Sequence, residues 1–452
     1  MSSGIRQTDH VFTVPLHHDR PSGEQIEVFA REVTADESLP WLVFLQGGPG
    51  HRAPRPLPAA LATGWLSRAL KDYRVLLLDQ RGTGRSTPAT RQTLPHRGDA
   101  RQQAEYLTAF RADSIVRDAE LIRRRLTGGA PWSVLGQSFG GFCAISYLSD
   151  APEGLAEVFI TGGVPTLDGD ADDVYRAAYP RMEDKNALFY HRYPQDVDRA
   201  RSIAEYLREH ETVLPDGTLL TVEAFQSLGI VLGATDGADR LHYLLEDPFC
   251  RTSGRAANRA VNRAADRVAG RSADRLADRS ELSDRFQWQV QAALSFAERP
   301  LYALLHEAIY AQGSAPTAWA ASRVRKEFPQ FDAERVLSQS AAPLLFTGET
   351  IHPWHFRTDP ALRPLRAVGD LLAGYENWRP LYDTSTLAAN DVPTFATVYR
   401  DDLYVDPKQS LVSAEAIRSM AVHVSDEHEH DGLTSSGTDV IDQLLGMARD
   451  AR

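Results

Sequence analysis

The chain has 452 residues, a formal net charge of −12 and an apolar fraction of 42%. This length suffices for about two or three domains, or for one large core with an insertion. The negative charge disfavours nucleic acids and anionic membranes as partners, and it is compatible with a cationic substrate.

Cysteine content and the lack of long apolar runs favour a soluble, cytoplasmic protein. The two cysteines, Cys143 and Cys250, are too few for a disulfide framework or a cysteine-based metal site. Residues 1–20 are polar and lack the apolar stretch of a secretion signal. No apolar run approaches membrane-spanning length. We therefore expect a protein that acts in the cytoplasm without a membrane partner.

The first third of the chain alternates short apolar segments with a helical pattern. The expected strands cover residues 11–14, 26–30, 42–45, 73–78, 132–135 and 158–161, and the expected helix covers residues 110–126. The first two strands have the pattern of an antiparallel pair. Buried apolar strands separated by helices predict a mostly parallel α/β sheet.

From about residue 164 the pattern becomes mainly helical for nearly two hundred residues, which indicates an inserted cap. Strands return at residues 392–399 and 421–424, and a closing helix is expected at residues 438–451. The sequence thus predicts an α/β core in two parts with a helical cap between them. The expected core, cap and second core segments are residues 1–165, 166–360 and 361–452.

Arginine recurs at every fourth residue from Arg255 to Arg279, within the expected cap. Each step of four residues advances about 40° beyond a full helical turn, so the arginines spread around a helix. Asp266, Asp274 and Asp278 partly neutralise them. We favour a solvated helical insertion over an anion-binding face.

The most informative motif is Gly136-Gln137-Ser138-Phe139-Gly140-Gly141, between an apolar strand and a helical run. A serine between two glycines in this context is typical of a nucleophile elbow. Glycine is needed because the turn leaves no room for side chains two residues on either side. The turn exposes the serine oxygen and directs the next N–H toward an oxyanion. Ser138 is therefore the candidate nucleophile.

An activated serine needs a base, and the base needs an acid that orients it. In this architecture both follow the serine in the chain, the acid after a late strand and the histidine after the last one. Residues 400–406 supply three acid candidates, Asp401, Asp402 and Asp406. His430 and His428 both follow the final strand. We favour His430, because the Asp431-Gly432 turn can present it inward, and we expect His423, within the strand, to be structural.

Residues 46–50, Gln-Gly-Gly-Pro-Gly, follow an earlier strand. Glycine there can bring backbone N–H groups close to a substrate, although it can also merely end the strand. We expect the N–H groups of Gly48 and Phe139 to form the oxyanion hole. Residues 79–82, Asp-Gln-Arg-Gly, are expected to brace the site by hydrogen bonds, with no catalytic role.

The chain resembles the prolyl aminopeptidases (proline iminopeptidases) of the α/β-hydrolase superfamily. The segments that carry the resemblance extend through most of the chain: Gly47-Gly48-Pro49-Gly50, residues 79–86, residues 136–141, residues 401–406 and His430-Asp431-Gly432-Leu433. The resemblance implies the α/β-hydrolase fold with a helical cap. It also implies Ser138 as nucleophile, Asp402 as acid and His430 as base.

The family also places cap glutamates around the free amino terminus of its substrate. Glu307 matches the family's cap segment best, and Glu349 is the second candidate; the alternative for each is a solvated or salt-bridged side chain. A cation in a half-buried pocket needs such a carboxylate, because an unpaired charge there is costly. Gln46 and Phe139 stand where many members have histidine and tryptophan, which bears on selectivity rather than on catalysis.

These features predict a serine aminopeptidase that releases N-terminal proline, or a similar residue, from short peptides through an acyl-enzyme. Neither a metal nor an organic cofactor is expected. One alternative is an esterase, lactonase or amidase that acts on a small molecule with the same triad, since one fold supports many chemistries. Another is a ligand-binding protein that has lost catalysis, which the complete triad disfavours.

Overall fold

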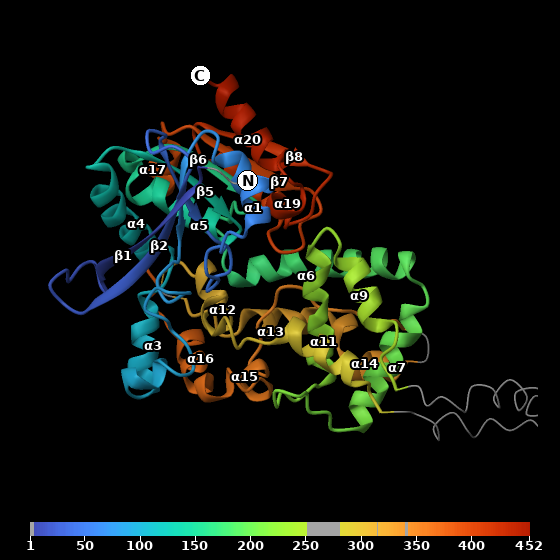
Figure 1. Ribbon diagram of the computed structural model, residues 1–452. Helices are drawn as coiled ribbons and strands as arrows, with labels where there is room; N and C mark the ends of the chain where they lie inside the picture. Colours follow the sequence, from blue (N-terminus) through green and yellow to red (C-terminus); the bar gives the residue numbers. More distant parts are fainter. Residues whose placement is uncertain (1–3, 251–280, 314, 340–341) are drawn as a thin grey trace, which may run out of the picture.

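An eight-stranded sheet organises the upper half of the molecule in the computed structural model, which describes residues 4–250, 281–313, 315–339 and 342–452 (Figure 1). The strand order is β1-β2-β4-β3-β5-β6-β7-β8. Their bounds are β1 Arg6–Pro15, β2 Gln25–Thr34, β3 Trp41–Leu45, β4 Arg74–Leu78, β5 Trp132–Gln137, β6 Leu155–Thr161, β7 Thr394–Tyr399 and β8 Met420–Ser425.

The sheet is antiparallel at one edge and parallel elsewhere. β1 pairs with β2 and β2 with β4 in antiparallel register, whereas every pair from β4 through β8 is parallel. Every expected strand is present, including the leading antiparallel pair. The predicted α/β fold is therefore confirmed.

Helices cover both faces of the sheet, which explains why the central strands are apolar on both sides. In β3, Val43 and Leu45 belong to one buried cluster, while Leu42 and Phe44 belong to the other. α4 (Ala112–Thr127) and α5 (Phe139–Asp150) pack together on the first face, and α2 (Gly64–Ala69) and α20 (Asp439–Asp450) pack together on the second. The expected helix at residues 110–126 corresponds to α4, which a separate helix, α3 (Ala100–Thr108), precedes.

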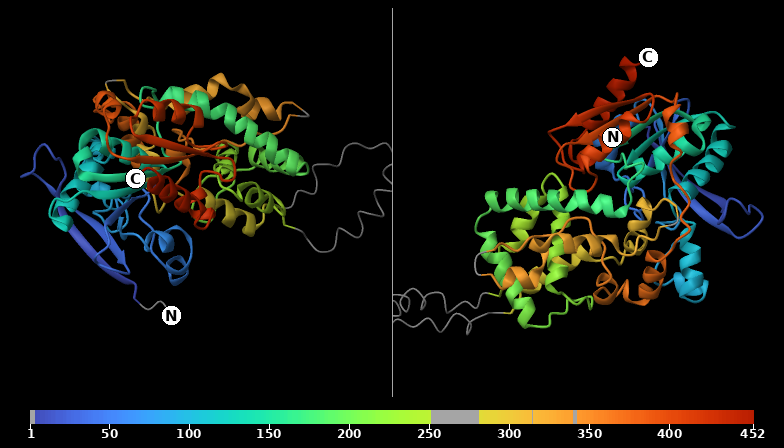
Figure 2. Two further views of the ribbon diagram at one scale, coloured as in Figure 1. Left: turned by 90° about the horizontal axis from the view of Figure 1, so that it is seen from above. Right: turned by 180° about the vertical axis from the view of Figure 1, so that it is seen from behind.

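A helical cap forms most of the lower half of Figure 1, and the view from behind in Figure 2 shows the same arrangement. The described α-helices within residues 171–373 are α6 Ala171–Arg192, α7 Asp196–Glu209, α8 Val222–Gln226, α9 Gly237–Leu245, α11 Asp284–Leu294, α12 Pro300–Leu305, α13 Ala320–Val324, α14 Ala333–Leu337, α15 His355–Thr358 and α16 Arg366–Ala373. The shorter helices outside the cap are α1 Pro58–Ala62, α17 Thr384–Ala388, α18 Pro407–Glu415 and α19 Gly432–Ser435.

Helix α16 follows residue 360 in the chain and packs against α12 of the cap and against α3. We therefore propose that the cap continues beyond residue 360, through α16, before the chain returns to the sheet. The arginine repeat at residues 255–279 lies outside the described residues.

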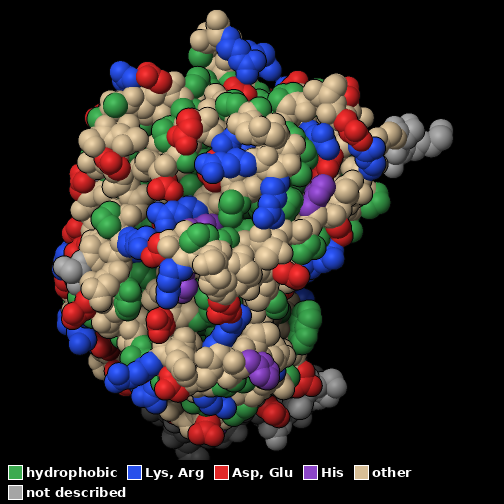
Figure 3. Space-filling model, turned by 90° about the vertical axis from the view of Figure 1, so that its left-hand side faces the viewer, with side chains coloured by type: hydrophobic (Ala, Val, Ile, Leu, Met, Phe, Trp, Pro, Cys, Tyr) green, Lys and Arg blue, Asp and Glu red, His purple; other side chains and the backbone are tan. Residues whose placement is uncertain are grey.

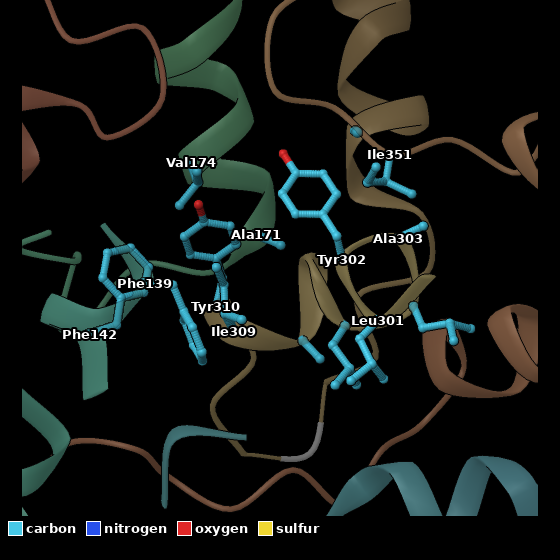
Figure 4. Packing of buried hydrophobic residues seen from close by; sticks show 14 of the residues in the cluster. Phe139, Phe142, Ala171, Val174, Leu301, Tyr302, Ala303, Ile309, Tyr310 and Ile351 are labelled. Atoms are coloured by element: carbon cyan, nitrogen blue, oxygen red, sulfur yellow. The ribbon is translucent and has the colours of Figure 1, made fainter. Parts of the chain in front are cut away.

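One cluster of buried hydrophobic residues extends from the core into the cap. Phe139 and Phe142 of α5 belong to the same cluster as Tyr302 of α12 and Tyr310 of the following 3-10 turn, Glu307–Tyr310 (Figure 4). The ring centroids of Phe142 and Tyr310 are 5.8 Å apart. The cap is thus packed directly over the start of α5, where the candidate nucleophile lies.

Basic and acidic side chains are interspersed over the face of the molecule in Figure 3, which views Figure 1 from its left-hand side. None of the helices that the structure describes combines the length and the apolar character needed to cross a bilayer.

Candidate active site

Ser138 lies at the junction of β5 and α5, in a backbone conformation that few residues other than glycine adopt. Its φ is 56° and its ψ is −125°. A Cβ on Gly136 would lie 2.4 Å from the carbonyl oxygen of Gly140, and a Cβ on Gly140 would lie 1.9 Å from that of Leu45. The two glycines therefore let α5 approach β5 and β3 closely enough to hold the serine in this strained turn.

The Gly47–Gly50 loop lies beside Ser138. A Cβ on Gly47 would be 2.9 Å from the Cβ of Ser138. The loop is held from behind, because the side-chain amide of Gln80 donates to the carbonyl oxygen of Gln46 at 3.0 Å. Phe139 is the first residue of α5, so its N–H is one of the unpaired donors at a helix N-terminus. This arrangement suits the expected oxyanion donors, Gly48 and Phe139.

Asp402 and His430 meet in a buried hydrogen bond. The Nδ1 of His430 lies 2.8 Å from Oδ2 of Asp402, and the two side chains are 8% and 2% exposed. The other carboxylate oxygen accepts from the backbone N–H groups of Tyr404, at 2.8 Å, and Val405, at 3.0 Å. Because the carboxylate accepts from Nδ1, the imidazole keeps its Nε2 free to act as a base.

A glycine turn after β6 adjoins both Ser138 and His430. A Cβ on Gly163 would lie 2.3 Å from the carbonyl oxygen of Ser138, and one on Gly162 would lie 3.2 Å from Nδ1 of His430. This turn therefore contacts Ser138 on one side and, on the other, His430, which is bonded to Asp402. His428, by contrast, is half-buried, and among the described residues the histidine bonded to the Asp402 side chain is His430.

The pKa of His430 is raised above its ordinary value. Burial opposes the charged form, but the charge of Asp402, its hydrogen bond and the charge of Glu349 together outweigh burial. The Tyr404 ring packs edge-on against the imidazole, with centroids 4.7 Å apart. Sequence reasoning missed Tyr404, although it lies within the segment that supplies the acid.

Glu349 lies in the cap, close enough for its charge to act on the ring of His430. The hydroxyl of Tyr302 donates to its Oε1 at 2.5 Å. The carboxylate is half-buried, and its charge also raises the pKa of Tyr310, for which burial is the larger cause. Glu349 thus places negative charge where it acts on His430, the candidate base.

Glu307 is more deeply buried in the cap. Its Oε1 accepts from the N–H of Ala321 at 3.0 Å, and its Oε2 has no hydrogen-bond partner among the described residues. Burial raises its pKa to about 7, against the opposing effect of donors in residues 317–321. The Tyr175 hydroxyl is also buried and has no hydrogen-bond partner among the described residues. Burial, and to a smaller extent the charges of Glu307 and Glu349, raise the pKa of Tyr175. Unpaired buried polar atoms of this kind are rare in folded proteins and mark a place where a ligand could bind.

The segment at residues 79–82 braces the site, as expected. Asp79 accepts from the N–H of Ala53 at 3.0 Å and from the N–H of Arg85 at 2.8 Å. Arg81 is fully buried and forms a two-pronged ion pair with Asp118, at 2.7 and 2.5 Å. These contacts fix the loop that lies behind Gln46.

Among the residues that the structure describes, no group of three or more histidine, cysteine or acidic side chains is arranged to hold a metal ion.

The fold and the site are those of an α/β-hydrolase, and the family profile described as alpha/beta hydrolase fold matches residues 40–434. Two curated relatives cover nearly the whole chain. The proline iminopeptidase of Aeromonas sobria is 43% identical over 99% of this chain and 97% of its own. The proline iminopeptidase aneH of Aspergillus aculeatus is 36% identical over 98% of this chain and 94% of its own. The chain therefore belongs to the proline iminopeptidase family within the α/β hydrolases.

Proposed function

We propose that this protein is a serine aminopeptidase that releases N-terminal proline, or a similar residue, from short peptides. The observation that carries the proposal is the Asp402–His430 hydrogen bond of 2.8 Å beside a serine elbow, beneath a cap that holds two buried or half-buried carboxylates. The membership of the proline iminopeptidase family supports the choice of an aminopeptidase over an esterase, lactonase or amidase.

The reaction follows from the roles of the side chains. Ser138 Oγ attacks the carbonyl carbon of the N-terminal residue, and its proton passes to Nε2 of His430. Asp402 stabilises the resulting imidazolium. The N–H groups of Gly48 and Phe139 hold the oxyanion. His430 then protonates the nitrogen of the departing peptide, the C–N bond breaks, and an acyl-enzyme remains. Water, deprotonated by His430, attacks the acyl-enzyme. The bond between Ser138 Oγ and the acyl carbon breaks, His430 returns the proton to Oγ, and the free amino acid is released.

We further propose that Glu349 and Glu307 bind the protonated amine of the substrate. Glu349 is the one whose charge reaches His430, so we place it nearer to the reacting carbonyl. The unpaired Oε2 of Glu307 offers a second acceptor deeper in the cap. A bound ammonium group would favour the ionised form of Glu307, whose pKa is otherwise about 7.

The proposal is tested by comparing kcat/KM for a prolyl arylamide and its N-acetylated form, across a panel of aminoacyl arylamides. The acetylated substrate has no cation and leaves the carboxylates desolvated without a partner, so it should be hydrolysed at least about 100-fold more slowly. Glu349→Gln and Glu307→Gln should each reduce this discrimination. Equal rates for free and blocked substrates would favour the esterase or amidase function instead.

We also propose that the enzyme acts in the cytoplasm, without nucleic acid or membrane partners. The net charge of −12 disfavours nucleic acids and anionic membranes as partners. The location rests on the cysteines. Cys143 is buried as a free thiol next to the elbow, and reduced cysteines are usual in the cytosol. Activity confined to the membrane or extracellular fraction of the source cells would contradict this location.

A further inference from the structure

A cavity of about 580 Å³ lies where the cap meets the core, beside residues 46–50, the loop proposed to supply an oxyanion donor and called the oxyanion loop below. Gln46, Gly50 and His51 line its core side, and Arg299 and Leu301 line its cap side. The two sides touch at Gly50, where a Cβ would lie 2.8 Å from the Cβ of Leu301. The same loop adjoins Ser138 at Gly47 and lines the cavity at Gln46, Gly50 and His51.

Arg299 is the cation in this cavity that lacks an acidic partner. Its Nη1 lies 2.9 Å from Nε2 of His51, and its guanidinium carbon lies 5.5 Å from the centroid of the Tyr302 ring. No described acidic side chain forms an ion pair with it, and neither its Nε nor its Nη2 bonds to a described residue. The neighbouring Arg52, by contrast, pairs with Glu298 at 3.0 Å. Two arginines and one glutamate leave the cavity with an uncompensated positive charge.

His51 fixes the direction of the Arg299 side chain. Burial, and then the charge of Arg299, lower the pKa of His51 to about 4, so the imidazole is neutral near neutral pH. A neutral ring can accept a hydrogen bond at Nε2 from the guanidinium. The same ring stacks on Tyr302, with centroids 5.7 Å apart and planes 6° from parallel. The guanidinium is thereby held with two of its nitrogens available to a ligand.

We infer that Arg299 binds the C-terminal carboxylate of the departing part of a short peptide, so that free dipeptides and tripeptides are the preferred substrates. This inference rests on the proposed aminopeptidase function. An arginine fork matches a carboxylate in shape and charge. The cavity lies beside the oxyanion loop, so the leaving group of a substrate bound at Ser138 can extend into it.

The spacing of the charged groups is consistent with this substrate class. Tyr302 connects the two ends of the site, since its hydroxyl bonds to Glu349 at 2.5 Å and its ring lies beneath Arg299. A dipeptide or tripeptide carries its two terminal charges roughly 7–10 Å apart when extended. We therefore expect a substrate of this length to place its amine at Glu349 and its carboxylate at Arg299.

The test measures kcat/KM for prolylalanine and for prolylalanine amide, which differ in the terminal carboxylate. The quantity compared is the ratio of acid to amide in the wild type, in Arg299→Met, in Arg299→Lys and in Arg52→Met. Loss of a charged hydrogen-bonded pair lowers kcat/KM for the substrate with the carboxylate by about 10- to 100-fold. We expect the ratio to fall by this factor in Arg299→Met, to fall less in Arg299→Lys, and to stay at its wild-type value in Arg52→Met.

A ratio that is the same in Arg299→Met and the wild type would overturn the inference, as would a larger change in Arg52→Met. Prolyl arylamide, which has no carboxylate, separates this failure from failure of the proposed function. If the wild type cleaves the arylamide and shows no Arg299-dependent preference, only the carboxylate site is wrong. If it cleaves neither the arylamide nor the dipeptides, the aminopeptidase function itself is wrong.

Discussion

At the scale of single residues, the hydrogen bond to Asp402 leaves Nε2 of His430 free for its proposed role as the base. Oδ2 of Asp402 binds Nδ1 at 2.8 Å, and two backbone N–H groups fix the other carboxylate oxygen. The imidazole is therefore held in one tautomer and one orientation. The chemistry of the site depends on this geometry more than on the number of histidines nearby.

His430→Ala should lower kcat/KM for a prolyl arylamide by about four orders of magnitude, and Asp402→Asn should be nearly as damaging. His428→Ala is the matched control, since His428 does not share the Asp402 bond, and it should keep most of the activity. Steady-state measurement of kcat/KM for the three folded variants tests these assignments. An inactive His428→Ala beside an active His430→Ala would show that the base is misassigned.

Glu349 provides a second test at this scale, through pH. Catalysis needs neutral His430, so kcat/KM should rise with pH as the ring loses its proton. The negative charge of Glu349 stabilises the protonated ring and contributes to its raised pKa. Glu349→Gln should therefore move the rising limb of the pH profile to lower pH, whatever the change in absolute rate.

The exposed residue Glu334 gives the control for this experiment. Glu334→Gln should leave the limb in place. Profiles of kcat/KM for a prolyl arylamide between about pH 5 and pH 9 bracket the ordinary histidine range. A limb that stays fixed, or moves to higher pH, in Glu349→Gln would mean that this carboxylate does not act on the base.

At the scale of elements, the elbow depends on how closely α5 approaches the sheet. A Cβ on Gly140 would lie 1.9 Å from the carbonyl oxygen of Leu45, the last residue of β3 before the oxyanion loop. Backbone cannot yield as a flexible side chain does, so α5 or β3 must shift. Either shift separates the nucleophile from its oxyanion donors.

Gly140→Ala should lower the free energy of unfolding by about 3 kcal/mol or more and abolish most of the activity. Gly446→Ala, within α20, is the control, because the nearest atom to its Cβ would be 3.9 Å away. Removing a glycine from a helix interior should stabilise the protein by about 0.5–1 kcal/mol. Urea unfolding of both variants measures this contrast, and equal stabilities would contradict the close packing of α5 on β3.

The strands could be predicted from the sequence because burial on both faces leaves continuous apolar runs such as Leu42 to Leu45. The elbow could be predicted because its glycines are required by local geometry. The cap could not be predicted in detail, since helices such as α12 and α15 are six and four residues long and give no clear period. The hydrogen bond between Tyr302 and Glu349 joins residues 47 positions apart, and only tertiary packing brings them together.

At the scale of the whole molecule, the cap is tied to the loops that carry the acid and the base. Arg181 of α6 donates to the carbonyl oxygens of Asp402, at 2.6 Å, and Arg400, at 3.1 Å. Thr235, before α9, donates to Asp431 Oδ1 through its backbone N–H at 3.0 Å and its hydroxyl at 2.7 Å. The cap therefore supports the loops that carry the proposed acid, Asp402, and the proposed base, His430.

Arg181→Met should lower kcat/KM by about tenfold and lower Tm, because two charge-assisted hydrogen bonds to the acid loop are lost. Arg176→Met is the control. Arg176 lies on the same helix but is exposed and forms surface ion pairs, so this variant should behave nearly as the wild type. Kinetics and thermal melting are measured together. Equal activities and equal Tm values for the two variants would show that α6 does not position Asp402.

We propose that Ser138 is the nucleophile of an aminopeptidase that requires a free amine. The most direct test is peptide mass spectrometry after reaction with a prolyl phosphonate that has a free amino group. We expect one adduct, on Ser138, that is absent in Ser138→Ala, slowed by a competing free prolyl peptide and unaffected by the N-acetylated peptide. An adduct on another residue, or full prolyl arylamide activity in Ser138→Ala, would show that Ser138 is not the nucleophile.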